Sequence, residues 1–541
     1  MSTHSTLAVA AATLLLVAVT MGVLRRDQSR NAPRSLSQAP KELPQPTKIA
    51  LNLKATLPEA VTLSSEADAF NKITDSYWAR QNREVFPACY VQPRSVEQLQ
   101  KAVKLLKQEY VDTKYAKGQG NEKGLFVVKG GGASPALGLN NVNSGVVIDL
   151  AHFRDITYAD DYSHVTVGCG LKWKDLYEDL EPKSLAVAGG RTVPVGVAGL
   201  TLQGGMSFYS PVRGFVCSTV TEYNVVLADG NAVVASETSY PDLWRALKGG
   251  SNNFGIVTSF TIPCFPSSDM WFTCNYTSGF QAPSLVKAFH DYVREASSGK
   301  PGAFDKNATI PITCLGYTSD LGVHATANYL GYTVPPKDKK WPPYWKKSPF
   351  GSLWNLWSTA KVQSLLSAVA EQSEQSPPGT YTIFAVTTFK NDLDTLMAAY
   401  TAYREASAAG KRVKGMILSL ALQPILPQWY KNGQPNVLGL DECNEPLVVA
   451  EITIKWDRTE HTELVQSISR RFIERVDKDA EANQTAHPFR FANYCAEWQD
   501  PMKGYGEENL QFMRTVSRKY DPEGVFQRAC IGGFKLGMDY H

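Results

Sequence analysis

The sequence lacks several patterns that would point to common enzyme classes. Its nine cysteines include no Cys-x-x-Cys pair, and none has a neighbouring histidine that would complete a zinc site. No His-Glu-x-x-His motif and no Gly-Lys-Ser phosphate loop occurs in the 541 residues. Metalloprotease and nucleotide triphosphatase activities therefore lose their main support, and we expect no metal site.

Charge of one sign is also lacking. The chain carries 55 Lys and Arg against 52 Asp and Glu, so no overall field would gather nucleic acid or hold the chain on an anionic membrane. We therefore expect small-molecule partners and no nucleic acid. The length predicts two or three domains, which is enough to bury a large cofactor.

One long uncharged run stands near the start, at residues 7–24, and Arg25 and Arg26 follow it directly. Residues 1–26 are predicted to be a signal peptide or a membrane anchor, followed by a proline-rich linker over residues 27–60. A cleaved signal would lead to secretion, whereas an uncleaved anchor would leave the bulk of the chain in the cytosol. Membrane contact is expected only through this segment.

Three glycosylation acceptor triplets favour the secretory pathway over a cytosolic location. They begin at Asn275, Asn307 and Asn483. A glycan can be added there only in the lumen or outside the cell. We therefore expect entry into the secretory pathway, with anchoring by residues 7–24 as the alternative.

The pattern of apolar residues predicts an α+β domain over residues 80–265. A helix is expected over residues 95–110, where Ser95 can cap it. Short apolar runs bounded by glycine predict buried strands at residues 124–129, 145–150, 164–168 and 222–227. The first two are expected to be joined by a glycine-rich turn.

A second domain of sheet and helices is expected over residues 266–480. Helices are predicted at 364–374 and 461–477, and extended segments at 381–388 and 447–456. Four tryptophans between residues 341 and 357 precede these elements. They indicate either a lid or membrane-surface patch, or a long loop held down by its aromatic side chains.

Three segments concentrate glycine where the backbone could approach a ligand. They span residues 128–135, 167–177 and 189–205. The first follows a strand, and its three consecutive glycines allow several amides to point at one place, as a pyrophosphate requires. Each segment alone could be a set of tight turns, but three in order within eighty residues favour a dinucleotide.

Several motifs then resemble a known family. They are YWARQ at 77–81, PACYVQP at 87–93, the glycines at 130–132, VGVAGLTLQGGMS at 195–207 and FGIVT at 254–258. Together they resemble the FAD-binding half of the vanillyl-alcohol oxidase superfamily. FANY at 491–494, YGEEN at 505–509 and KYDPEGVF at 519–526 resemble the C-terminal segment of berberine-bridge-like enzymes, in the form common among fungal secondary-metabolite oxidases.

The resemblance implies FAD held in a two-subdomain, PCMH-type domain. The substrate domain would cover the flavin, and a C-terminal segment over residues 485–541 would return to the FAD domain. In that arrangement Asn493 would contact the flavin and Tyr494 would lie near the substrate. The residues implied to bind the cofactor are Lys129, Gly130, Gly131, Gly132, Ala133, Ser134, Thr192, Gly196, Gly199, Gly255, Ile256, Val257 and Asn493.

Two positions depart from the family. Many relatives attach the flavin through a histidine after the glycine triplet and a cysteine in the later glycine-rich stretch, but this chain has Ala133 and Thr192 there. We therefore expect non-covalent FAD. The same loss leaves open a flavin that is structural or a chain that has lost its redox activity.

The family chemistry is transfer of a hydride from a substrate to the flavin, with a base that removes a proton and O2 as the electron acceptor. Tyr494 and Glu451 are the candidate catalytic residues, although strand alternation also allows Glu451 to face solvent. Two rival functions remain: a cyclase that uses FAD only as a scaffold, and a membrane-anchored binding protein without flavin. The substrate is expected to be a phenolic, polyketide, alkaloid or sugar alcohol.

Overall fold

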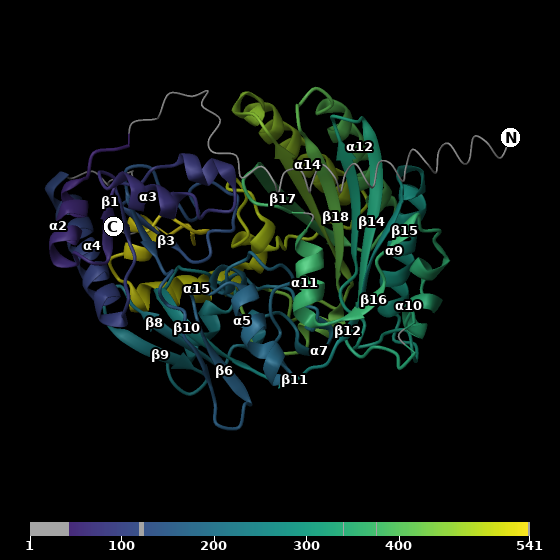
Figure 1. Ribbon diagram of the computed structural model, residues 1–541, viewed down its shortest axis with the longest axis horizontal. Helices are drawn as coiled ribbons and strands as arrows, with labels where there is room; N and C mark the ends of the chain where they lie inside the picture. The colour runs from purple at the N-terminus through teal and green to yellow at the C-terminus, as the bar shows by residue number, and fades with distance from the viewer. Residues whose placement is uncertain (1–42, 118–123, 339, 375, 539–541) are drawn as a thin grey trace.

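The computed structural model describes residues 43–117, 124–338, 340–374 and 376–538. The predicted signal or anchor at residues 1–26 lies outside these ranges. The described residues form two halves side by side, with those from 43 to 263 and the C-terminal segment on one side and the large green sheet on the other (Figure 1).

The first half begins with a four-stranded sheet. Strands β2, β4 and β3 are parallel and β1 joins at one edge in the antiparallel sense. Their bounds are β1 (Val61–Leu63), β2 (Cys89–Val91), β3 (Phe126–Lys129) and β4 (Val146–Asp149), and the nearby helices are α2 (Lys48–Thr56), α3 (Ala67–Thr74) and α4 (Val96–Lys117).

Helix α2 corrects the predicted extent of the linker. Ile49, Ala50 and Leu53 of this helix are buried, and the side chain of Thr47 accepts a hydrogen bond from the amide of Ala50. Residues 48–56 are therefore part of the folded body, although proline density had predicted a linker up to residue 60. An N-cap residue followed by apolar positions at helical spacing outweighs the composition of the preceding stretch.

A five-stranded antiparallel sheet completes the first half, in the order β5-β6-β10-β8-β9. Its strands are β5 (Ile156–Tyr158), β6 (His164–Gly168), β8 (Glu222–Val226), β9 (Ala232–Ser236) and β10 (Ile256–Pro263). The helices that follow these strands or connect them are α5 (Trp173–Leu180), α6 (Val197–Leu202), α7 (Ser210–Arg213) and α8 (Pro241–Leu247). A two-stranded ribbon pairs β7 (Leu185–Ala186) with β11 (Phe265–Pro266).

The second half is built on one eight-stranded sheet in the order β15-β12-β14-β13-β18-β19-β17, with β16 also paired to β12. The strands are β12 (Met270–Ser278), β13 (Ile312–Thr318), β14 (Val323–Tyr332), β15 (Trp357–Ser358), β16 (Lys361–Gln363), β17 (Tyr381–Lys390), β18 (Ile417–Ile425) and β19 (Leu447–Trp456). The helices are α9 (Ala282–Ala296), α10 (Pro343–Lys347), α11 (Leu365–Ser373), α12 (Leu393–Ala409), α13 (Pro427–Tyr430) and α14 (Thr462–Ala482). Helices α9, α12 and α14 pack on one face of the sheet, and the first half lies toward the other (Figure 1).

The C-terminal segment returns to the first half, as expected. Helix α15 (Glu507–Tyr520) packs on α8, and the Lys519 ammonium lies 2.7 Å from the Asp242 carboxylate. Farther along, the amide of Ile531 donates to the carbonyl of Phe126 on β3, and Cys530 bridges the same residue in the parallel sense. The last part of the chain thus extends the edge of the first sheet.

The predicted elements agree closely with the structure. The expected strands at 164–168 and 447–456 are β6 and β19, and the other predicted strands begin and end within two residues of observed ones. The predicted helices at 95–110 and 461–477 start within one residue of α4 and α14, but these helices run on to Lys117 and Ala482. The predicted glycine-rich turn between the first two strands was wrong: β3 and β4 are parallel, so residues 130–145 form a long crossing loop. The predicted α+β fold class is confirmed.

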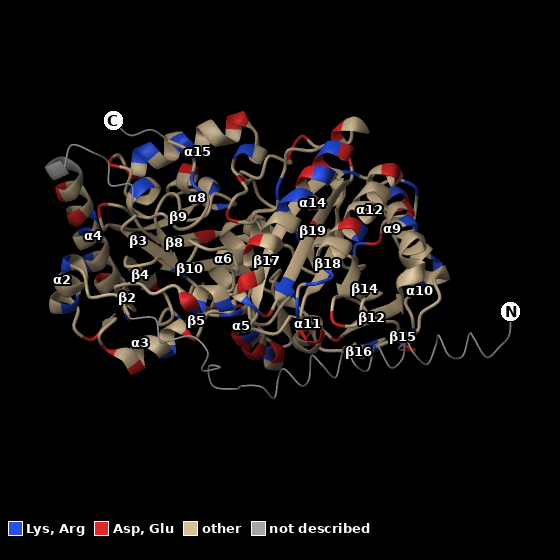
Figure 2. Cartoon of the chain, turned by 90° about the horizontal axis from the view of Figure 1, so that it is seen from above, with Lys and Arg blue, Asp and Glu red and all other residues tan. Residues whose placement is uncertain are grey.

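The tryptophan-rich segment contains both buried and exposed rings. Trp345 is fully buried, and its indole N–H donates to the carbonyl of Gly331 at 2.8 Å, whereas Trp354 is 62% exposed. Trp345 thus pins helix α10 to β14, and the rest of the segment leads past exposed Trp354 into strand β15. Figure 2 shows positive and negative side chains interspersed over the molecule, consistent with the balanced composition.

Candidate functional site

A cavity of about 640 Å³ lies between the two halves. One wall comes from the first half: the loop after β3, residues 191–206 and the start of β10. The other wall is the face of the large sheet formed by β12, β14, β13, β18 and β19. A ligand in this cavity would therefore contact the glycine-rich segments and the sheet at once.

The loop after β3 offers free backbone donors to the cavity. Gly132 has φ +64°, a conformation that favours glycine. Within the described ranges, the amide N–H groups of residues 131–134 donate no hydrogen bond to another residue. Adjacent unused amides at a cavity wall suit the oxygens of an anionic group such as a pyrophosphate. This wall therefore fits the phosphate part of a dinucleotide.

Some glycines in these segments serve packing and not a ligand. A Cβ added to Gly131 would lie 2.4 Å from the Cα of Gly196, and one added to Gly196 would meet Gly131 at 2.6 Å. Likewise, a Cβ at Gly190 would meet the Trp173 ring at 2.5 Å. The missing side chains let two backbone segments touch, which fixes the loop after β3 against the entry to α6.

Gly199 is different. A Cβ added there would meet nothing within 4 Å, and the residue lines the cavity. Its missing side chain therefore leaves space in the cavity itself. The start of β10, predicted to contact the cofactor through Gly255, Ile256 and Val257, also lines the cavity.

Lys129 differs from the other predicted cofactor residues because it does not line the cavity. Its side chain is buried, and the ammonium lies 3.0 Å from the Asp149 carboxylate and 3.0 Å from the Ser76 hydroxyl. The pair joins the ends of the parallel strands β3 and β4 beneath the glycine loop. The Lys129 side chain thus supports the glycine loop without facing the cavity.

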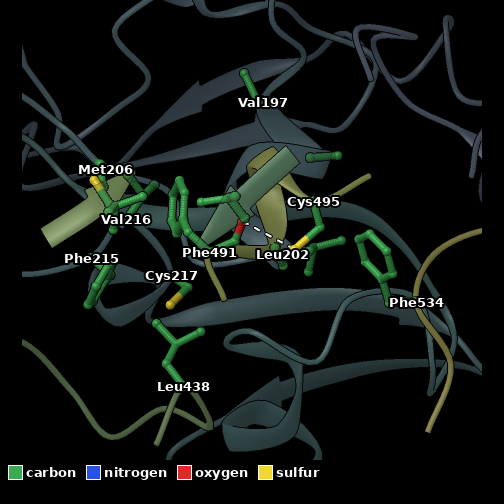
Figure 3. Packing of buried hydrophobic residues seen from close by; sticks show 14 of the residues in the cluster. Val197, Leu202, Met206, Phe215, Val216, Cys217, Leu438, Phe491, Cys495 and Phe534 are labelled. Atoms are coloured by element: carbon green, nitrogen blue, oxygen red, sulfur yellow. Dashed lines mark hydrogen bonds between the residues drawn. The ribbon is translucent and has the colours of Figure 1, made fainter. Parts of the chain in front are cut away.

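An apolar cluster supports the cavity floor (Figure 3). Leu202, Met206 and Phe491 line the cavity and belong to this cluster, in which the thiol of Cys495 donates to the carbonyl of Phe491 at 3.7 Å. The cluster joins α6 and its following loop to the C-terminal segment, so the two segments form one continuous wall.

On the sheet wall, β19 places three polar side chains in a row. Glu451, Thr453 and Lys455 alternate along the strand and all line the cavity. Glu451 is only 7% exposed, so the alternative in which it faces solvent is wrong. Burial raises the pKa of Glu451 to about 7, although the Thr453 hydroxyl donates to its Oε1 at 2.9 Å and Arg191 lowers the pKa. This carboxyl group is therefore poised to exchange a proton near neutral pH.

Arg191 forms the centre of a polar network that spans the cavity. Its Nη2 donates to Oε1 of Gln423 on β18 at 2.7 Å and to the hydroxyl of Tyr494 at 3.1 Å. The Gln423 Nε2 donates to the same hydroxyl at 3.4 Å. Arg191 is buried, and its Nη1 has no hydrogen-bond partner among the described residues. The network therefore joins the wall from the first half, the sheet and the C-terminal segment at one point.

The two predicted C-terminal residues lie together in the short 3-10 helix η7 (Ala492–Tyr494), and both line the cavity. The Asn493 side chain accepts from the amide of Gly205 at 3.1 Å and donates to the carbonyl of Leu200 at 3.2 Å. It thereby ties the C-terminal segment to the end of α6. Burial raises the pKa of Tyr494, and Glu451 adds to this rise while Arg191 opposes it.

Lys455 lies farther along the same wall. Its ammonium contacts the hydroxyl of Ser376 at 3.1 Å and stands 5.9 Å from the centre of the Trp78 ring. Burial lowers the pKa of Lys455 to about 8. Trp78 and Ser376 also line the cavity, which gives this end both an aromatic and a polar surface.

Sequence analysis missed Arg191, Gln423 and Lys455. Lys455 could have been found from the period of two that it shares with Glu451, once β19 was known to be buried on one face. Arg191 lies inside a segment chosen for its glycines. Its partner Gln423 is 232 residues away, and no local pattern links the two.

The residues present fit FAD. Unused amides line the cavity at the glycine loop, Gly199 leaves open space, and polar groups face that space from the sheet. Ala133 and Thr192, which occupy the two positions of covalent attachment in many relatives, line the same cavity.

Comparisons with known proteins agree with this site. A family described as an FAD binding domain matches residues 87–236. FAD-dependent monooxygenase tpcD of Cochliobolus heterostrophus is 30% identical over 488 residues, covering 86% of this chain and 88% of that protein. FAD-dependent monooxygenase FUP4 of Fusarium proliferatum is 32% identical over 476 residues, covering 85% and 87%.

Solved structures of the same fold include 6-hydroxy-D-nicotine oxidase from Arthrobacter nicotinovorans. It has a TM-score of 0.67 and 18% identity, and covers 87% of this chain and 98% of that one. Glucooligosaccharide oxidase from Acremonium strictum, described with a 6-S-cysteinyl, 8α-N1-histidyl FAD, has a TM-score of 0.68 and 18% identity, and covers 90% and 100%. These likenesses establish the fold.

The chain belongs to the family of FAD-dependent enzymes that its fungal relatives represent, and its fold is that of the FAD-linked oxidases. It is an FAD-dependent oxidoreductase, as its motifs predicted, and over most of its length it matches fungal members named FAD-dependent monooxygenases. The comparisons give no support to the scaffold cyclase or to a flavin-free binding protein.

The described residues contain no helix that is long and apolar enough to cross a membrane. The candidate anchor at residues 7–24 falls outside them. Of the three glycosylation triplets, Asn275 is buried within β12, whereas Asn483 is exposed after α14. In the folded chain, Asn275 is thus inaccessible to a glycosylating enzyme.

Proposed function

We propose that this oxidoreductase oxidises a small organic substrate in secondary metabolism. The substrate would lie between non-covalent FAD and the β12–β19 sheet. The observation that carries this proposal is a single cavity joining the unused amides after β3 to the buried row Glu451, Thr453 and Lys455. Cofactor and substrate can then occupy adjoining parts of one enclosed space.

FAD would be held by residues on the first wall. The amides of residues 130–134 would bind the pyrophosphate, while Thr192, Gly196 and Gly199 would border the cofactor. Gly255, Ile256, Val257 and Asn493 complete this wall in the proposal. Lys129 would act indirectly, by holding the loop through its pair with Asp149.

When bound, FAD supplies the acceptor for a hydride from a substrate carbon. Glu451 would accept the accompanying proton from the substrate, since a carboxyl group with a pKa of about 7 is largely ionised just above neutral pH and still basic enough to take a proton. Tyr494 would contact the substrate from the C-terminal segment, which also lines the cavity. The apolar remainder of the cavity would exclude bulk water from both groups.

Ala133 and Thr192 support non-covalent attachment, because neither side chain can form the bonds described for the bicovalent relative. The direct test is acid precipitation of purified protein. Flavin absorbance that moves wholly into the supernatant supports the proposal, whereas flavin in the pellet overturns it.

O2 is the proposed electron acceptor. The names of the fungal relatives favour a second possibility, in which an oxygen atom enters the product. Turnover under isotopically labelled oxygen gas separates the two: an oxidase leaves the label in peroxide or water, and a monooxygenase places it in the product.

The function itself is tested by oxygen consumption in a substrate screen with the FAD-loaded protein. Glu451→Gln should lower turnover by a factor of about 10² to 10⁴ and retain FAD. Turnover by this variant at the rate of the unchanged protein would remove Glu451 from the proposal.

We also propose entry into the secretory pathway through residues 7–24, with membrane anchoring by the same run as the alternative. Exposed Asn483 supports the lumenal route. Amino-terminal sequencing and alkaline extraction of membranes distinguish a cleaved signal from an anchor.

A further inference from the structure

Exposed apolar side chains gather at one end of the large sheet. Phe280 follows β12 and is 90% exposed, and Trp354 is 62% exposed. Their segments are held together, because the Nε2 of Gln281 donates to the carbonyl of Trp354 at 3.1 Å. Trp357, also exposed, stands opposite Tyr276 in the pairing of β15 with β12. Single exposed apolar residues are ordinary, but neighbouring ones form a patch that suits an apolar partner.

The tip of the β13–β14 hairpin adds a fourth apolar side chain to this patch. A Cβ on Gly279 would lie 2.6 Å from the carbonyl oxygen of His324, so the segment that carries Phe280 packs directly against the start of β14. Leu321 lies three residues before His324, in the turn of the hairpin, and is exposed. The four side chains form an apolar rim, made of Phe280, Leu321, Trp354 and Trp357.

The apolar rim lies at the mouth of the cavity. Leu321 lines the cavity and is also exposed, so the cavity opens to the surface at the hairpin. Thr318 and Val323, on either side of the turn, line the cavity as well. Trp357 and Tyr276 are directly paired and so project from the same face of the sheet, and Tyr276 lines the cavity. A molecule that enters at this mouth therefore passes the apolar rim first.

A basic loop borders the apolar rim. It joins α12 to β18 and carries three exposed cations, Lys411, Arg412 and Lys414. The basic loop is docked on the hairpin, because the Ser319 hydroxyl donates to the carbonyl of Val413 at 2.6 Å. The apolar and the cationic side chains therefore belong to one continuous surface at this end of the sheet.

Acidic groups near the basic loop offset only part of its charge. The Asp320 carboxylate accepts from the amide of Gly415 at 3.0 Å, and a Cβ on Gly415 would meet the Asp457 carboxylate. Burial, and after it the neighbouring Arg404, lowers the pKa of His324 to about 4, so Arg404 lies beside the hairpin and His324 is uncharged at neutral pH. Around the hairpin, four cations thus stand against two carboxylates.

We propose that the apolar rim and the basic loop rest on the surface of a bilayer that contains anionic phospholipid, which places the mouth of the cavity at the membrane. Aromatic rings beside cationic side chains favour the boundary between lipid and water. Each Lys or Arg near an anionic surface strengthens binding by about fivefold. This contact is additional to the one expected at residues 7–24. It goes beyond the proposed function and requires no flavin.

The test measures tryptophan fluorescence with vesicles whose phosphatidylcholine carries brominated acyl chains, prepared with and without phosphatidylserine. Bromine quenches an indole only on close contact, and the first tryptophan of the chain is Trp78, so attachment by residues 7–24 alone brings no indole into the bilayer. The full chain should be quenched when phosphatidylserine is present, and less so at high salt. Trp354→Phe with Trp357→Phe should remove most of this quenching and leave sedimentation with the vesicles in place.

Vesicle affinity is measured on the chain from residue 27, which keeps every described residue, with the full chain run beside it. Lys411→Gln with Lys414→Gln should weaken this affinity by about thirtyfold. Lys346→Gln with Lys347→Gln is the matched control, because it removes the same charge from exposed positions of α10, at the opposite end of β14. The control should leave the affinity unchanged. All four positions are exposed, so the melting temperature should not change in either variant.

A second matched pair tests the apolar side chains. Phe280→Ser should weaken vesicle affinity by about tenfold or more, since the ring would no longer leave water on binding. Leu51→Ser, at an exposed position of α2 in the first half, should not weaken it.

Three results would overturn the proposal. Vesicles with phosphatidylserine could leave the fluorescence of the full chain unchanged, or the α10 control could lose as much affinity as the variant of the basic loop, which would indicate a general attraction of cations. Light scattering without lipid could also show a dimer that Phe280→Ser converts to a monomer, and the apolar rim would then be an interface with a second copy of the chain.

Discussion

Two glycines that line the same cavity should respond in opposite ways to a single methyl group. Gly131→Ala would place a Cβ 2.4 Å from the Cα of Gly196, where non-bonded carbon atoms normally stand about 3.5 to 4.0 Å apart. Backbone atoms cannot rotate away, so one segment must move by about 1 Å. Gly199→Ala would place its Cβ where no protein atom lies within 4 Å.

The expected magnitudes follow from this contrast. Overpacking of this kind costs about 1 to 3 kcal/mol, so Gly131→Ala should lower the melting temperature of the FAD-free protein by several degrees. Gly199 lies within α6, where alanine is favoured over glycine by about 1 kcal/mol. Gly199→Ala should therefore leave the FAD-free protein at least as stable, while its methyl group enters the cavity and weakens FAD binding about tenfold or more.

Both variants can be measured on one preparation. FAD is removed and the melting temperature recorded, and FAD is then titrated back while its fluorescence is followed. The reasoning fails if Gly199→Ala binds FAD with unchanged affinity, because the open space beside it would then not belong to the cofactor. It also fails if Gly131→Ala melts at the temperature of the unchanged protein.

Four further predictions concern other parts of the molecule. Lys129→Met should cost about 3 to 5 kcal/mol, because it leaves the buried Asp149 carboxylate without its cation, and chemical denaturation of the FAD-free protein checks this loss. Since burial raises the pKa of Glu451 from 4.5 to about 7, turnover should rise with pH through about 7, and Glu451→Gln should abolish that rise in a pH profile of kcat/KM. The raised pKa of Glu451 contributes stability that is fully present below pH 4.5 and is lost as the pH rises through about 7. Glu451→Gln should therefore raise the melting temperature near pH 8 and not near pH 4. An equal effect at both pH values would contradict the burial argument. Trp345→Ala should cost about 3 to 5 kcal/mol in thermal unfolding, whereas Trp354→Ala, at a 62% exposed position, should change stability by less than about 0.5 kcal/mol.

The sequence was most informative where the signal is local. Strand β6 and helix α4 depend on apolar spacing within a few residues and on a cap, and the Ser95 hydroxyl accepts from the amide of Gln98 as that cap requires. Strand direction is a non-local property. The apolar runs at β3 and β4 were correct, but nothing in them shows that the two strands run parallel and need a long connection.

The glycine-rich segments do line the cavity, but the sequence alone could not show which glycines allow two backbones to pack and which leave space in the cavity. Gly131 and Gly196 are small because two backbones touch, and Gly199 is small because a cavity lies beside it. Both requirements produce the same residue. The distinction appears only when segments that are 65 positions apart in the chain, at residues 131 and 196, are brought into contact.

The polar groups of the site also come from segments that are far apart in the sequence. Glu451 could be proposed, but whether it faced solvent or the cavity depended on which side of β19 was covered. Arg191 and Gln423 acquire a role only through each other and through Tyr494. These hydrogen bonds join three side chains from distant parts of the chain, so they cannot be predicted from the sequence around any one of them.

The cavity exists because the centre of the sheet carries small side chains on one face. Cys314 and Gly316 of β13 stand opposite Ala327 and Ala325 of β14, and on the other side opposite Ala421 and Ser419 of β18. Larger residues at these positions would fill the space and close the sheet against the first half. The small residues end at Glu451 and Thr453 of β19, the next strand in register, so the open area leads directly to the carboxyl group. A flat, largely apolar molecule lying on this area would therefore reach the Glu451 carboxyl group with one edge.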